Sequence, residues 1–219
     1  MDILSPQLLY FLETILFATV LSMHLVKKNF VIISLYSLQS FIISILLFSA
    51  TLREASLLLL GVAVATFFIK VIVAPYFFFR LIKKIRLHFL VSTYLNGPLI
   101  LIVLALLTTF SHSQYFKPLT ILAPGNENAL LLTVGMIFIS VFLIINRKGA
   151  LSQMVGVLSL ENAIVSFAFL AGLEQAPGPQ LGIIFEIALW VVIATVFASM
   201  IYQQFGSLNV AAMVELKED

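Results

Sequence analysis

Seven long apolar runs, separated by short charged or polar turns, limit what this chain can fold into. An α-helix needs about 20 apolar residues to cross the hydrocarbon core of a bilayer, and each run has roughly that length. The runs are continuous rather than alternating in polarity, so they do not suit the strands of a membrane barrel. We therefore predict an all-α, polytopic membrane protein with about seven transmembrane helices, at 7–26, 30–51, 55–80, 89–110, 128–145, 149–172 and 181–204.

The composition agrees with a membrane protein and excludes several classes of site. Of the 219 residues, 62% are hydrophobic and 10% are charged, against about 25% charged in a soluble domain. The chain has no cysteine, which excludes a disulfide scaffold and cysteine-ligated zinc or iron–sulfur centres. Its three histidines are scattered, and a net charge of +2 without a basic patch does not suit nucleic acid. We expect no catalytic residue, cofactor or metal on this chain.

Lysine and arginine are unevenly divided between the two sides of the predicted bundle. Cytoplasmic turns carry the excess of these residues in membrane proteins, so the richer side is predicted to be cytoplasmic. The N-terminus would then lie outside and the C-terminal tail inside. Two residues, Arg53 and Lys117, fall on the poorer side, and nine fall on the richer side, namely Lys27, Lys28, Arg80, Lys83, Lys84, Arg86, Arg147, Lys148 and Lys217.

Three ionisable residues lie inside apolar runs, where charge is costly and usually functional. Glu161 is halfway along the sixth run, Lys70 is near the middle of the third, and Glu186 is about a turn and a half inside the seventh. Gln39 in the second run and Asn162 beside Glu161 add neutral polar groups. One interpretation is a buried ion pair that fixes helix packing. The other is a proton or ion relay, because burial and nearby charges move pKa values; both can hold together.

Three further residues are weaker candidates. Glu13 is about two turns into the first run and is either a place where protons join the relay or an interfacial glutamate. His24, near the end of that run, is predicted to be an interface residue rather than a ligand. Pro75 leaves a backbone carbonyl one turn back without its usual donor, so a kink is expected beside Lys70.

The first three and the last three runs look alike. Each set has a run, a short basic turn, a run with a polar residue at its centre, and a run with a charge. Residues 36–41 (Tyr-Ser-Leu-Gln-Ser-Phe) align with residues 158–163 (Leu-Ser-Leu-Glu-Asn-Ala), which places Gln39 opposite Glu161. Lys70 then roughly corresponds to Glu186.

Four crossings separate the starts of the two copies, so they would point the same way. This predicts a parallel three-helix repeat, unlike the inverted repeats of many transporters. The predicted organisation is an N-terminal three-helix unit at 1–86, a fourth helix with an outer loop at 87–127, and a second three-helix unit with a cytoplasmic tail at 128–219.

The C-terminal unit, 128–219, resembles the small K-type membrane subunit of respiratory complex I. That subunit has a glutamate in the middle of its second helix, another in its third, and a cytoplasmic tail similar to Leu-Asn-Val. The matching features are Glu161, Glu186 and residues 206–210 (Gly-Ser-Leu-Asn-Val). Counted back from the tail, the third-helix acid would fall at Trp190, so Glu186 is displaced by one helical turn, about 5.4 Å.

The whole chain is similar to the hydrogenase-4 component E family of membrane-bound group 4 hydrogenases and formate hydrogenlyases. The similarity covers nearly the full length and this seven-helix layout. It rests on residues 69–75 (Ile-Lys-Val-Ile-Val-Ala-Pro), residues 160–162 (Leu-Glu-Asn), Glu186, and the tail at 206–217.

The resemblance implies a non-catalytic subunit of a hydrogenase-type oxidoreductase complex in a prokaryotic inner membrane. Its partners would be antiporter-like and quinone-chamber-like membrane subunits, and a soluble arm with nickel–iron and iron–sulfur centres. Its proton-relay residues would be Glu161, Glu186, Lys70 and Gln39. The alternatives are a subunit of a cation/proton antiporter-type complex, a stand-alone secondary transporter, or an assembly protein, and the choice between protons and sodium stays open.

Overall fold

The computed structural model describes residues 4–55, 57–85, 92–172, 199 and 202, and these ranges are mainly helical. Five helical spans are long and apolar enough to cross a membrane, and a sixth apolar helix is shorter. This confirms the prediction of an all-α, polytopic membrane protein. The seventh predicted run, 181–204, lies almost entirely outside the described residues. The five long spans are Pro6–Leu25, Asn29–Leu52, Leu59–Lys83, Glu127–Asn146 and Ala150–Leu170.

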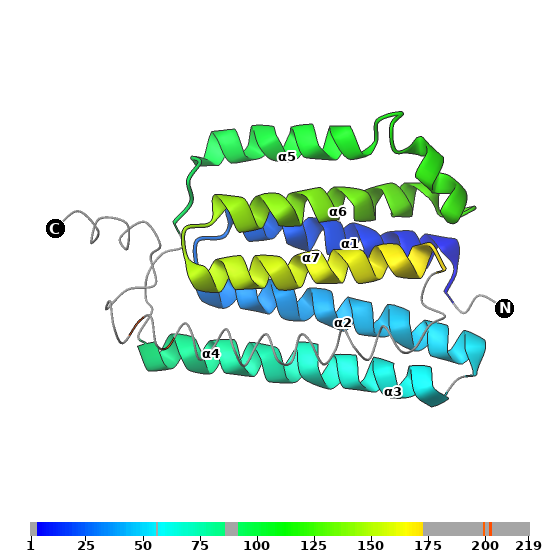
Figure 1. Ribbon diagram of the computed structural model, residues 1–219, viewed down its shortest axis with the longest axis horizontal. Helices are drawn as coiled ribbons and strands as arrows, with labels where there is room; N and C mark the ends of the chain where they lie inside the picture. The colour runs from blue at the N-terminus through cyan, green and yellow to red at the C-terminus, as the bar shows by residue number, and fades with distance from the viewer. Residues whose placement is uncertain (1–3, 56, 86–91, 173–198, 200–201, 203–219) are drawn as a thin grey trace.

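Four helices form the central bundle (Figure 1). Helix α1 packs against α2 and α6, and α7 packs against the same two helices. In Figure 1, α1 and α6 run in one direction, whereas α2 and α7 run in the other. A parallel repeat requires these directions, although the repeat itself stays a prediction. The four helices are α1 (Pro6–Leu25), α2 (Asn29–Glu54), α6 (Glu127–Asn146) and α7 (Ala150–Leu170).

A long rod flanks the bundle along α2 and corresponds to the predicted third run. It consists of α3 (Leu57–Thr66), the π-helix η1 (Phe67–Val73) and α4 (Ala74–Ile85), which follow one another without a break. All three segments contact α2. The π-helical segment contains Lys70, so the irregular part of the rod is the part that carries its buried charge.

Helix α5 (Gly97–Ser111) packs on the opposite flank, against α6. The predicted run began at 89, but the described helix begins at Gly97. Asn96 explains the start, because its side chain accepts a hydrogen bond from the Leu99 N–H at 3.1 Å. Pro98 stands in the first turn, where proline costs no helical hydrogen bond. After α5, a short 3₁₀ helix, η2 (Lys117–Leu122), leads toward α6.

Helices α6 and α7 approach closely because small residues line their contact. A Cβ atom at Gly156 would lie 2.9 Å from Ile144 Cγ1, so a larger residue does not fit there without movement. Nearby, the hydroxyl oxygens of Ser140 and Ser159 are 3.3 Å apart inside the bundle. Small and hydroxyl residues at helix contacts are typical of membrane bundles.

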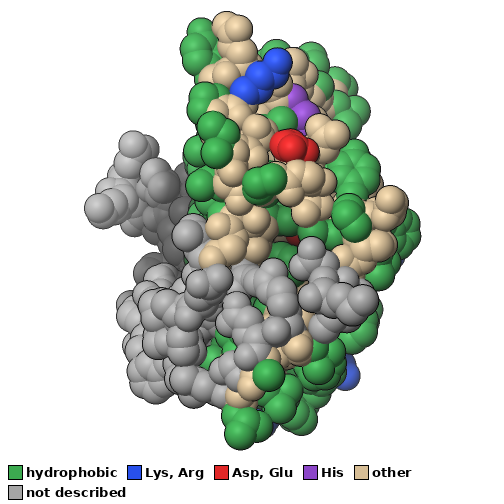
Figure 2. Space-filling view, turned by 90° about the vertical axis from the view of Figure 1, so that its right-hand side faces the viewer, with side chains coloured by type: hydrophobic (Ala, Val, Ile, Leu, Met, Phe, Trp, Pro, Cys, Tyr) green, Lys and Arg blue, Asp and Glu red, His purple; other side chains and the backbone are tan. Residues whose placement is uncertain are grey.

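The two ends of the bundle differ in charge. The turns at 26–28 and 147–149 and the end of α4 lie at the same end (Figure 1), which therefore collects most of the described basic residues. Figure 2 views the other end, where basic, histidine and acidic side chains lie near one another at the top of the view, beside hydrophobic side chains. The exposed ionisable residues there include His112, Lys117 and Glu127. The basic residues of the described chain therefore lie mainly at one end, and the cytoplasmic location of that end stays a prediction.

Candidate functional site, a buried cluster of charges

A buried ion pair joins η1 of the flanking rod to α7 of the bundle. The Lys70 ammonium is 2.6 Å from Glu161 Oε1 and donates a second hydrogen bond to Asn162 Oδ1 at 3.1 Å. Lys70 is 1% exposed. Residues about ninety positions apart in the sequence therefore meet, and the pair of a lysine with a glutamate anticipated in the sequence is present in the structure.

Helix α2 completes the cluster through a hydroxyl group. The Asn162 side-chain amide donates to Ser40 Oγ at 3.1 Å, and both residues are buried. Tyr36, one turn before Ser40, is also fully buried. The alignment of the two predicted repeat copies places Ser40 opposite Asn162. Their hydrogen bond therefore joins positions at the same depth, and it places Gln39 at the level of Glu161.

The π-helix around Lys70 has a local cause in Pro75. The Ala74 N–H donates to the Ile69 carbonyl five residues back, which is the π-helical pattern. Pro75 has no N–H to bond the Val71 carbonyl, and this carbonyl accepts instead from Ser37 Oγ at 3.2 Å. The sequence predicted the displaced carbonyl but not the π-helix, nor its hydrogen bond to α2. Single π-helical turns are frequent at functional sites.

The stability of the ion pair depends on the cost of burying two charges and on the attraction between them. The Lys70 side chain is 2% exposed and that of Glu161 is 19% exposed. Removing such ions from water costs several kcal/mol each, which a short contact and additional hydrogen bonds offset. Because the attraction requires both charges, a proton on the Glu161 carboxyl would remove it. The attraction within the pair therefore depends on the charge of the Glu161 carboxyl.

The structure places only some of the predicted relay residues in this cluster. Lys70 and Glu161 are paired. Gln39 is buried, and its Oε1 atom has no hydrogen-bond partner among the described residues, so its part in a relay stays a prediction. Glu186 lies outside the described residues. Ser40 was not anticipated as a site residue, although it is the position that the repeat alignment pairs with Asn162.

A second buried acid lies between α1 and α7. Glu13 is 0% exposed, and the Ser166 hydroxyl donates to its Oε1 atom at 2.6 Å. Glu13 is therefore not a solvent-exposed residue, and its depth in the membrane stays a prediction. Its position in the first apolar run did not reveal its burial, because one helix alone does not define which of its faces a neighbour covers.

At the basic end, Arg147 is buried rather than solvated. It is 1% exposed, and its Nη2 atom donates to the carbonyls of Met23 and Val26, the latter at 3.2 Å. Burial lowers the pKa of Arg147 to about 10, so the guanidinium remains charged at neutral pH. His24 is buried as well, and its Nε2 donates to the Ile139 carbonyl at 3.1 Å. His24 lies in the last turn of α1, and its predicted position at the membrane interface, rather than as a ligand, stays a prediction.

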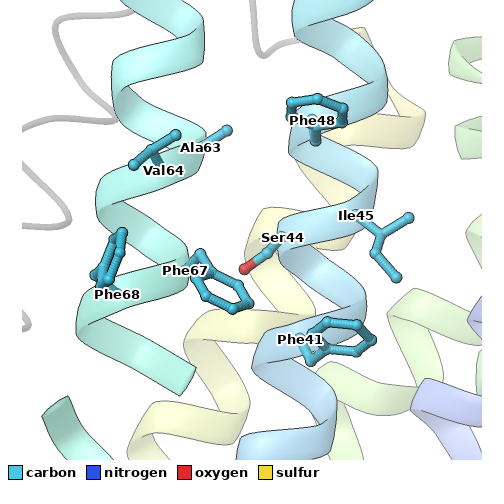
Figure 3. Close-up of a pocket in the computed structure, with 8 residues that line it drawn as sticks. All are labelled: Phe41, Ser44, Ile45, Phe48, Ala63, Val64, Phe67 and Phe68. Carbon is cyan, nitrogen blue, oxygen red and sulfur yellow. The ribbon is translucent and has the colours of Figure 1, made fainter. Parts of the chain in front are cut away.

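An apolar groove of about 290 Å³ lies between α2 and the rod of α3 and η1 (Figure 3). Phenylalanines from both helices line it, and the hydroxyl of Ser44 is its one side-chain polar group. That hydroxyl donates to the Ser40 carbonyl at 2.8 Å, so it is already satisfied. The groove suits hydrocarbon and does not suit an ion. Its lining is Phe41, Ser44, Ile45, Phe48, Ala63, Val64, Phe67 and Phe68.

Comparisons of the chain with protein families, with curated proteins and with solved structures gave no significant match. Among the described residues, no three histidine, aspartate or glutamate side chains are grouped to hold a metal ion. The functional interpretation therefore depends on the buried cluster and on the sequence motifs.

Proposed function

We propose that this chain is a non-catalytic membrane-arm subunit of a complex I-like membrane-bound hydrogenase or formate hydrogenlyase. In this role its Lys70–Glu161 pair takes part in proton or sodium translocation driven by redox chemistry on other subunits. The observation that carries the proposal is the 2.6 Å ion pair inside a helical membrane bundle. The choice of complex is supported by the sequence resemblance around residues 69–75 and 160–162.

The pair works as a switch between two charge states in this proposal. In the closed state the Lys70 ammonium holds the Glu161 carboxylate. When a proton binds a Glu161 carboxyl oxygen, the carboxyl becomes neutral and the attraction is lost. Lys70 then keeps its hydrogen bond to Asn162 or moves away, and loss of the proton restores the pair. A sodium ion neutralises the carboxylate in the same way.

The π-helical segment gives Lys70 a route to move. In η1 the hydrogen bonds run to the fifth residue back, and Pro75 prevents a regular helix at this point. The Ser37 hydroxyl on α2 donates a hydrogen bond to the Val71 carbonyl, so a change in η1 also displaces a group that is bonded to α2. The same helix α2 also contacts Asn162 through Ser40. Movement of Lys70 is therefore coupled to the bundle core.

The substitution Glu161→Gln tests the role of the acid. Glutamine keeps the size and hydrogen-bonding capacity of the side chain but cannot bind a proton. We expect an assembled complex with ion translocation, and the redox turnover coupled to it, reduced at least tenfold. Glu127→Gln is the matched control, because Glu127 is exposed at the start of α6. Normal translocation by an intact Glu161→Gln complex would show that this carboxyl is not part of the path.

The identity of the complex is tested by its partners. Tagged chain purified in mild detergent should migrate as a large assembly on a native gel. Mass spectrometry of this assembly should identify nickel–iron and iron–sulfur subunits together with antiporter-like membrane subunits. Antiporter-like subunits without a redox arm would instead favour a cation/proton antiporter-type complex. A chain that purifies alone but transports ions would favour a stand-alone secondary transporter.

A further inference from the structure

Glu13 is a buried carboxyl group, and no cation of the described residues is its partner. Its Oε1 atom accepts the Ser166 hydroxyl at 2.6 Å. Its Oε2 atom is buried and has no hydrogen-bond partner among the described residues. Glu161, in contrast, has the Lys70 ammonium at 2.6 Å. The two acids of the bundle interior therefore have different surroundings.

The described helices around α1 supply no cation at this depth. Helix α5 has no ionisable residue, and α6 has Glu127 at its exposed start. Within the apolar span of α2 the one ionisable residue is Tyr36, and within α7 it is Glu161. Apart from Glu13, the ionisable residues of α1 are Tyr10 near its start and His24, which lies about three turns after Glu13. A carboxylate in such surroundings is costly and becomes neutral by binding a proton.

Glu13 lies close to the Lys70–Glu161 pair along the bundle. Ser166, its hydrogen-bond donor, follows Asn162 by four residues on α7. Four residues span about 6 Å and return to the same face of a helix. Ser159, Asn162 and Ser166 are all buried on this face. On this face, Asn162 next to Glu161 and Ser166 in contact with Glu13 are two polar groups one turn apart between the two acids.

We propose that Glu13 is a second proton-binding site of this subunit, next in line to the Lys70–Glu161 pair. It lies toward the end of the bundle where α1 begins and α7 ends. A proton binds Oε2 of Glu13, and on transfer that O–H bond breaks while an O–H bond forms on the Glu161 carboxylate. The Lys70 ammonium keeps its protons throughout. This inference rests on the proposed function, because it extends the path that starts at Glu161.

Infrared spectroscopy tests whether Glu13 binds a proton. The intact complex in lipid nanodiscs is measured at neutral pH in H₂O and D₂O, in the stretching region of protonated carboxyl groups. Glu13→Gln should remove one band that shifts in D₂O. Ser166→Ala should keep this band but change its frequency, because the carbonyl loses its hydrogen-bond donor. Glu127→Gln is the exposed control and should leave the band unchanged. An unchanged band in Glu13→Gln would overturn the proposal.

Translocation tests whether this proton is part of the path. Glu13→Gln is nearly isosteric and can still accept from Ser166, so the complex should assemble. We expect ion translocation to fall at least tenfold, with Glu13→Asp retaining part of it. If Glu161→Gln stops translocation but Glu13→Gln does not, only the present inference fails. If Glu161→Gln also leaves translocation intact, the proposed function fails with it.

Discussion

Arg147 and Lys70 are two cations that are each 1% exposed, yet they are held in different ways. Arg147 donates to the backbone carbonyls of Met23 and Val26 at the end of α1. Lys70 donates to the side chains of Glu161 and Asn162. A backbone carbonyl neither binds a proton in the physiological range nor leaves its place. A carboxylate does bind protons, so in the proposed function the contact of Lys70 is switched and that of Arg147 is not.

The surroundings of the two cations sharpen this difference. The turn that carries Arg147 is fixed by backbone hydrogen bonds of 3.0 Å from Tyr94 to Asn146 and 3.2 Å from Lys148 to Ser92. Lys70 lies instead in a π-helical segment. Burial alone therefore does not separate a structural cation from a functional one. The chemical nature of the acceptor, and the regularity of the helix that carries the cation, separate them.

Lys70→Met should have the largest effect on stability. It leaves Glu161 inside the bundle without its ion-pair partner, and removal of one member of a buried pair costs about 3–5 kcal/mol. The loss of unfolding free energy can be measured by titration with a denaturing detergent in mixed micelles. It should shrink at low pH, because protonation of Glu161 removes the uncompensated charge. A loss that does not depend on pH would show that Glu161 is not charged in this variant.

Arg147→Met should come next, because it leaves carbonyls rather than a charge without a partner. Loss of the hydrogen bonds to Met23 and Val26 is expected to cost about 2–3 kcal/mol, at the scale of a bond to a charged group. Ion translocation per folded complex should stay normal. Reconstituted vesicles with matched amounts of complex measure this. Translocation reduced as strongly as in Glu161→Gln would erase the distinction between the two cations.

Ser37→Ala should have the smallest effect on stability and a larger one on turnover. The variant removes the donor to the Val71 carbonyl, which costs about 1 kcal/mol. Because this hydrogen bond joins η1 to α2, we expect slower translocation in a complex that assembles normally. Ser34→Ala is the matched control, since the Ser34 hydroxyl donates to the Phe30 carbonyl within its own helix. Equal translocation rates in the two variants would show that the hydrogen bond between η1 and α2 has no part in the mechanism.

The sequence alone predicted the part of this comparison that concerns Lys70. A lysine and a glutamate in the middle of apolar runs are expected to pair with each other, because lipid does not solvate their charges. The sequence left two acids, Glu161 and Glu186, as partners of Lys70. The contact of the Lys70 side chain with α7 selects Glu161 among the described residues. The π-helix could be foreseen only as a local effect of Pro75.

The structural role of Arg147 was not predictable, because its position in a basic turn is typical of a solvated cytoplasmic residue. Whether a turn folds over a neighbouring helix end depends on the packing of α1 against α6, which no local pattern encodes. Glu13 was ambiguous for the same reason. The start of α5 was predictable in principle, since Asn96, Gly97 and Pro98 form a capping sequence. The apolar residues that precede this capping sequence led to a predicted helix start at 89 instead.

The double variant Lys70→Met/Glu161→Met tests the central claim most directly, because it separates packing from charge. Replacing both members of a buried ion pair with apolar residues is often neutral or stabilising. We therefore expect recovery of the stability lost in Lys70→Met, normal assembly, and ion translocation reduced at least tenfold in reconstituted vesicles. A stable, assembled double variant that translocates ions at the normal rate would contradict the account and leave the pair a packing device.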